Sequence, residues 1–203
     1  MKNLGLLGLL ALAGCVDLKS AYPEKRFYTI EAPRSGPART GPEGTVLRVR
    51  RFSASRLFEG SELVHRNADS EYESDFYSVF FVPPAAQVGE QAQRWLGQSK
   101  VFATVVGTGS SAAETHVLEG NLVALYGDRR GPKAPLAVLE VQFMVVGLSS
   151  DPAAVLLQKS YREEIGIPKD DAESLVRGWT QGLSKVLGAL EEDLSRIDRS
   201  ARK

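Results

Sequence analysis

The chain has few of the residues on which covalent or metal-based chemistry usually depends. Its 203 residues include one cysteine, Cys15, and two histidines, His65 and His116. A single cysteine excludes an internal disulfide framework and a zinc site built from several thiolates. The two histidines lie far apart in the chain, each in a predicted strand. We expect them to be structural residues, with no metal, no cofactor and no catalytic site.

An excess of charge of either sign is also missing. Lysine and arginine number 25 against 25 aspartate and glutamate residues, so the formal net charge is zero. A nucleic-acid-binding domain normally carries a basic face, so this class is excluded. The motifs HExxH, GxSxG and the P-loop are absent. GTGSSA at 107–112 has the spacing G-x-G-x-x-A, but a strand follows it instead of the helix that a dinucleotide loop needs, so it is interpreted as a turn.

The N-terminus contains a short apolar run followed by the lone cysteine. Lys2 precedes ten apolar residues at 4–13, too few to span a bilayer but typical of a secretory signal. Leu12-Ala13-Gly14-Cys15 then has the form of a bacterial lipobox. In this pattern the cysteine is acylated, palmitate being a typical chain, and cleavage occurs before it. The sequence therefore predicts a signal peptide over 1–14 and lipidation of Cys15.

The residues after Cys15 bear on the compartment. Several acyl chains on one cysteine anchor a protein stably without a membrane-spanning helix. Residues 15–25 are interpreted as a tether. Aspartate directly after the cysteine favours retention in the inner membrane, but here Val16 takes that place and Asp17 follows. We expect an outer-membrane protein that faces the periplasm, with the inner membrane as the alternative.

Hydrophobic periodicity predicts one α+β domain over 26–198, with a mixed, largely antiparallel sheet and two main helices packed on it. Apolar residues make up 43% of the chain, enough for a substantial core. A strand at 62–66 is expected to return antiparallel to the strand beginning at 45. The second helix follows Leu175 to Leu194, with Asp170 as cap and Glu173 completing a capping box. Further strands are expected at 26–30, 76–82, 101–106, 115–127, 135–147 and 155–165, a helix at 84–98 and a loop at 31–44.

Aromatic residues are densest in the strand expected at 76–82. Strict alternation would place Phe76 and Phe80 on one face, and Tyr77 and Phe81 on the other. Both faces would then be apolar. The strand is either covered on both sides, or it exposes a surface for a partner or for lipid.

Two clusters of charge have modest interpretations. Residues 69–75 hold four carboxylates but no glycine for a calcium loop, so a solvated loop is expected. A basic strand face, either solvated or in contact with anionic lipid or an acidic partner, is formed by Arg48, Arg50, Arg51 and Arg56.

The order of elements over 47–105 resembles the ABC-type transport auxiliary lipoprotein component family. The matching features are Leu47-Arg48-Val49, Leu63-Val64-His65-Arg66, Phe76-Tyr77, Pro83-Pro84, Leu96, and Phe102 with Val105. Position 65 is often aromatic in that family and is histidine here. The lipobox and Tyr28-Thr29-Ile30 agree with the resemblance.

The resemblance implies an α/β sandwich with a mixed sheet and a non-enzymatic, lipid-anchored role. Such lipoproteins accompany mammalian-cell-entry (MCE) type ABC transporters, which move phospholipids or other hydrophobic molecules across the Gram-negative envelope. The implied partners are an MCE-domain substrate-binding protein, its permease and ATPase, and phospholipid itself. Only Cys15 carries over as a functional residue. The alternatives are an envelope assembly or scaffold lipoprotein unrelated to lipid transport, and a secreted enzyme, which the two distant histidines would serve poorly.

Overall fold

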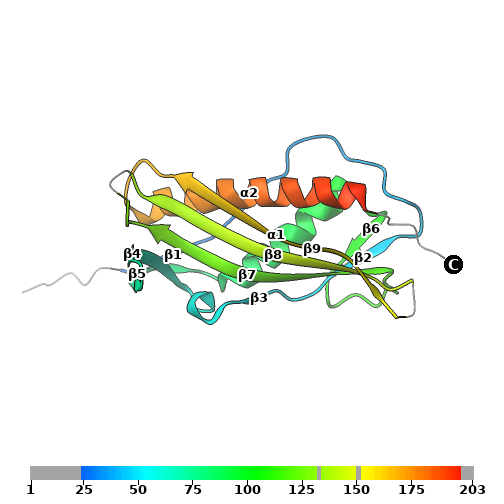
Figure 1. Ribbon diagram of the computed structural model, residues 1–203, viewed down its shortest axis with the longest axis horizontal. Coiled ribbons are helices and arrows are strands. Elements are labelled where there is room, and N and C mark those ends of the chain that lie inside the picture. Colours follow the sequence, from blue (N-terminus) through cyan, green and yellow to red (C-terminus); the bar gives the residue numbers. More distant parts are fainter. Residues whose placement is uncertain (1–23, 132–133, 150–151, 198–203) are drawn as a thin grey trace, which may run out of the picture.

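The computed structural model describes residues 24–131, 134–149 and 152–197. Two α-helices and a mixed nine-stranded sheet make up this part, so the predicted α+β class is confirmed (Figure 1). The lipobox, Cys15 and nearly all of the tether lie outside the described residues. The elements are β1 (Arg26–Tyr28), β2 (Val46–Val49), β3 (Ser53–Ala54), the 3₁₀ turn η1 (Arg56–Phe58), β4 (Glu62–Ala68), β5 (Glu71–Phe80), α1 (Pro84–Ser99), β6 (Thr104–Val106), β7 (His116–Asp128), β8 (Leu136–Gly147), β9 (Ala154–Gly166) and α2 (Ala172–Arg196).

The sheet is organised around the long strand β7. One edge of β7 pairs along its length with antiparallel β8, and β8 pairs in the same way with β9. The other edge receives β2, β3 and β4 in succession, all parallel to β7. β6 extends the sheet beyond β2, while β5 and then β1 extend it beyond β4. The strands on this edge of β7 therefore form two separate groups, β2 with β6 and β4 with β5 and β1. The group of β1, β4 and β5 lies at one end of the molecule (Figure 1).

The prediction that β4 returns antiparallel to β2 is wrong. Both strands run in the same direction along β7, since Leu47 pairs with His116 and His65 pairs with Gly127. The chain does bend at 59–61 before β4 begins, as expected, but β3 and η1 lie between β2 and this bend, and β3 pairs with β7. The antiparallel partner of β4 is β5. Local periodicity shows where a strand lies but not which of its neighbours it pairs with.

The core lies between one face of the sheet and the two helices. Leu139, Val141, Phe143 and Val145 alternate along β8 and are almost fully buried, as expected for the covered face of a strand. α2 approaches closely at Gly178, where a Cβ atom would meet the side chain of Ala137 at 2.5 Å. Glycine at this position is therefore required by the spacing between helix and sheet.

The N-cap of helix α2 lies one residue later than predicted. Asp171, not Asp170, is the N-cap, and its side chain accepts a 2.7 Å hydrogen bond from the backbone N–H of Ser174. The hydrogen bonds from Ser174 favour the ionised carboxylate and hold the pKa of Asp171 below its ordinary value. Asp170 instead pairs with Arg129. Glu173 forms an ion pair with Arg177, so the predicted capping box does not form.

Two other sequence-based boundaries also need correction. The acidic stretch expected as a loop at 69–75 turns only near residue 70, and β5 begins at Glu71, because β4 and β5 pair up to the Ala68–Glu71 step. The strand expected from 101 begins at Thr104. Val101 and Phe102 are buried before it, after Lys100 ends α1 in the left-handed conformation (φ 55°).

The segment 29–45 between β1 and β2, here called the strap, crosses the helical side of the molecule (Figure 1). The loop predicted at 31–44 is thus confirmed as non-strand, and it is held in place by side chains of both helices. The backbone N–H of Ile30 donates to Gln87 Oε1 (2.7 Å) and that of Ala32 donates to Gln91 Oε1 (3.1 Å). These buried glutamines of α1 replace the backbone partners that the strap lacks.

Glu191 of α2 ties the strap to both helices. Arg34 donates two hydrogen bonds to its carboxylate at 2.9 and 3.0 Å, and Arg39 donates a third at 3.0 Å. Trp95 of α1 donates from Nε1 at 2.8 Å. The bonds from Arg34 are the main cause that lowers the pKa of Glu191 to about 2; burial opposes the shift, and Arg39 and Trp95 add to it.

Candidate functional surface

A bulge in β5 carries two exposed aromatic residues, Phe76 and Tyr77. Glu62 of β4 pairs with Val79, while the next residue, Leu63, pairs with Asp75, so residues 76–78 are extra on β5. Asp75 Oδ1 accepts hydrogen bonds from the backbone N–H groups of Tyr77 (2.8 Å) and Ser78 (3.0 Å), which closes the bulge. Burial opposes ionisation of Asp75, but bonds from Ser78 and Tyr77 outweigh it and lower the pKa.

The bulge breaks the strict alternation expected for this strand. Phe76 is 64% exposed and Phe81 is 71% exposed, whereas Phe80 is only 2% exposed. Phe80 packs on Trp179 of α2, with ring centroids 5.6 Å apart, and so belongs to the core. Of the four aromatic residues considered for a partner or lipid surface, Phe76, Tyr77 and Phe81 are therefore on the surface.

Phe27 of β1 completes this surface. β1 pairs in parallel with β5, opposite Val79, and Phe27 is 60% exposed. Its ring meets that of Phe81 edge-to-face, with centroids 5.8 Å apart. Phe76 and Tyr77 form a second such pair at 5.2 Å. We call these four residues, Phe27, Phe76, Tyr77 and Phe81, the aromatic patch.

The aromatic patch lies where the described chain begins. Lys25, two residues before Phe27, places its ammonium group 4.4 Å from the centroid of the Phe76 ring. A cation beside exposed aromatic rings gives the patch an amphipathic character. The sequence contained Phe27 in an expected strand, but nothing local indicated that this strand pairs with β5.

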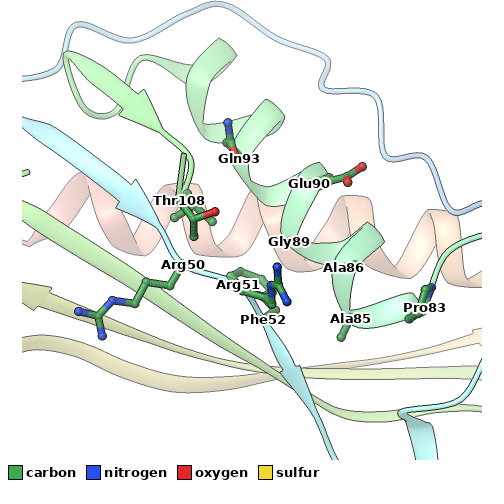
Figure 2. Close-up of a pocket in the computed structure, with 11 residues that line it drawn as sticks. Arg50, Arg51, Phe52, Pro83, Ala85, Ala86, Gly89, Glu90, Gln93 and Thr108 are labelled. Carbon is green, nitrogen blue, oxygen red and sulfur yellow. The ribbon is translucent and has the colours of Figure 1, made fainter. Parts of the chain in front are cut away.

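A cleft of about 450 Å³ lies between α1 and the segment after β2. Figure 2 shows Phe52 facing Ala85 and Gly89 of α1, with Arg51 beside it. Phe52 is buried and packs over Gly120 of β7, where a Cβ atom would meet its ring at 2.5 Å. The cleft therefore combines an apolar floor with a polar rim.

The four arginines considered as a basic face do not act together. Arg48 donates to the carbonyl groups of Gly107, Ser110 and Ala112 and pairs with Glu114. It thereby fixes the turn at 107–112, and the element that follows this turn is strand β7, as predicted. Arg50 and Arg51 both line the cleft, but the guanidinium group of Arg50 pairs with Glu119 at 2.5 Å and extends away from α1 (Figure 2). Arg56 lies apart from these, in η1.

Both histidines are buried strand residues, in β4 and β7. His116 lies 2.7 Å from Thr115 Oγ1 through Nδ1, and its ring packs on Phe102. His65 borders a polar cavity of about 310 Å³ with Asp75, Arg129 and Asp170. Burial and then the nearby Arg129 lower the pKa of His65, so it is neutral at pH 7. Within the described ranges, no group of three histidine, cysteine, aspartate or glutamate side chains could hold a metal ion.

Comparison with known proteins finds similarity in structure but not in sequence. No family model matches the chain, and no curated protein matches it. Protein XCC0632 from Xanthomonas campestris, of family DUF330, is similar with a TM-score of 0.66 and 18% identity, covering 81% of this chain and 93% of that one. An uncharacterized protein has the same TM-score at 14% identity, covering 85% and 99%. The hypothetical protein CT253 from Chlamydia trachomatis reaches 0.51 at 9% identity, covering 74% and 97%.

These comparisons show that the chain has a DUF330-like fold. At such low identity they concern the fold and not the role. In the part of the chain that the structure describes, no helix is long and apolar enough to cross a membrane.

Proposed function

We propose that this protein is a non-enzymatic, lipid-anchored auxiliary component of an MCE-type ABC transport system in the Gram-negative envelope. The observation that carries the proposal is the lipobox at Cys15 ahead of a domain whose element order resembles the auxiliary lipoprotein family. The DUF330-like fold is consistent with it. The transported molecules would be phospholipids or other hydrophobic compounds.

The role that fits this arrangement is geometric. An acylated Cys15 would hold the domain at one membrane, and the domain would dock the MCE-domain protein there. Tethering raises the effective concentration of a docking surface, so individually weak contacts suffice. The absence of catalysis is part of this proposal. It is supported by the positions of His65 and His116, which lie buried in different strands and each pack into the fold.

The decisive experiment is co-purification from detergent-solubilised envelopes. The affinity-tagged protein should recover an MCE-domain protein with its permease and ATPase, and an unrelated tagged lipoprotein from the same cells should not. Reproducible recovery of envelope assembly proteins in their place would support the scaffold alternative and count against transport. Genes for a permease, an ATPase and an MCE protein beside this one would independently support the proposal.

Localisation is proposed as the outer membrane, facing the periplasm, on the basis of Val16 after Cys15. Density-gradient separation of the two membranes tests it directly. Mass spectrometry of the mature N-terminus tests the anchor itself, since an unmodified Cys15 would remove the basis for either membrane.

A further inference from the structure

We infer that the aromatic patch is a bilayer-contacting surface that inserts into the headgroup region of the membrane carrying the anchor. The inference rests on the lipid anchor of the proposed function and adds a second, non-covalent contact between the domain and the bilayer. Its occupant is lipid, not a protein partner and not a second copy of the chain.

The chemistry of the patch fits the membrane interface. Phe27, Phe76 and Phe81 each expose 60% or more of their surface, and Tyr77 exposes 39%. Aromatic rings with a polar or cationic companion favour the boundary between headgroups and acyl chains. Lys25 supplies that companion over the Phe76 ring and can reach a lipid phosphate while its stem stays against the ring.

The chain connectivity selects lipid over the other occupants. Cys15 and Glu24, the first described residue, are nine positions apart, which limits their separation to about 30 Å even for a fully extended chain. Phe27 follows three residues later, in β1. The aromatic patch is therefore the exposed apolar surface that the anchor brings to the bilayer most directly.

The bulge explains why two of these rings, those of Phe76 and Tyr77, project from the domain. A regular β5 would turn alternate side chains toward α2, as Phe80 is turned. Asp75 closes a bulge that places Phe76 and Tyr77 outside the core, at the end of the wing formed by β4, β5 and β1. Exposing rings in this way costs free energy in water, and contact with lipid recovers it.

Val155 provides a matched control at the other end of the sheet. It is 57% exposed, and it pairs with Val146, which pairs with Val117 at the start of β7. β4, which connects β5 and β1 to the rest of the sheet, pairs with β7 at Gly127. Ten residues of strand separate the two positions along β7, or about 33 Å. If the patch inserts into the bilayer, a probe in the patch should therefore contact lipid and a probe at Val155 should not.

The test uses lipidated mature protein reconstituted into phosphatidylethanolamine–phosphatidylglycerol vesicles that contain lipids with brominated acyl chains. F81W and V155W each add one exposed indole to the background of Trp95 and Trp179, both buried. We expect brominated lipid to quench the added F81W emission at least twofold and to leave V155W unchanged. Equal quenching of both, or of neither, overturns the inference. F81W emission that changes only at high protein density, or only when the MCE protein is added, assigns the patch to a protein interface and also overturns it.

A second measurement separates failure of the patch from failure of the anchor. The chain starting at residue 16 retains every described residue and hence the whole described core. Its sedimentation with vesicles should fall at least about tenfold in F76S/F81S but not in L148S/V155S, which removes exposed apolar residues elsewhere. Circular dichroism and thermal midpoints confirm folding of both variants. Equal partitioning of the two variants refutes membrane contact by the aromatic patch. An unmodified Cys15 refutes the anchor, but this comparison still tests the patch because its chain lacks Cys15.

Discussion

Glu191→Gln is the substitution whose effect on stability can be worked out most fully. The Glu191 side chain is 8% exposed and Arg34 is 7% exposed, so their ion pair is shielded from water. The folded-state pKa of about 2 lies roughly 2.5 units below the ordinary value of 4.5. At about 1.4 kcal/mol per unit, the ionised carboxylate contributes about 3 kcal/mol to the free energy of unfolding at pH 7. Glutamine keeps an acceptor for Trp95, so we expect a loss of about 2–3 kcal/mol.

The pH dependence gives the sharper test. Because folding lowers the pKa of Glu191, its contribution is complete above pH 4.5 and is lost as the pH falls from 4.5 to about 2. Urea unfolding at a series of pH values should therefore show the difference between wild type and E191Q shrinking over this window. The same window should weaken the attachment of the strap, which would appear as lower protection factors for amide exchange at Ile30 and Ala32.

Glu192→Gln is the matched control. Glu192 is the next residue, pairs with Arg39 and Arg196, and has a side chain that is 46% exposed. Exposed pairs of this kind contribute about 1 kcal/mol at most. An E191Q effect no larger than that of E192Q at pH 7, or one that stays constant down to pH 2.5, would refute the reasoning.

The remaining predictions concern the cap, the core and the sorting signal. D171A removes the cap of α2 and should lower the free energy of unfolding by about 1 kcal/mol, whereas D170A should not lower helix content by circular dichroism. F80A should cost about 3–5 kcal/mol in urea unfolding, against less than about 0.5 for exposed F81A, and similar values for the two would contradict the assigned burial. V16D places aspartate after Cys15 and should shift the protein from outer-membrane to inner-membrane fractions; unchanged fractions would exclude residue 16 as the sorting signal.

The sequence by itself determined the class of fold and the position of nearly every element. The period-2 pattern of Leu139, Val141, Phe143 and Val145 and the helical spacing from Leu175 to Leu194 are local properties. Burial of one face enforces both patterns, so they could be read without knowing any neighbour. Pro83-Pro84 marked the start of α1 for an equally local reason, because proline fits the first turn of a helix. The lipobox is likewise a contiguous signal, and it remains a prediction.

Only the tertiary structure decided how these elements pair and which side chains they bring together. β2 and β4 look like a hairpin in the sequence, yet each pairs with β7, because contacts distant in sequence outweigh the short turn at 59–61. The four hydrogen bonds that Glu191 accepts come from residues that precede it in the chain by between 96 and 157 positions. The aromatic patch likewise depends on pairing, since β1 brings Phe27 to Phe81 and the Asp75 bulge turns Phe76 outward while Phe80 stays in the core. A sequence specifies such surfaces only through the strand register, which residue patterns along one strand do not contain.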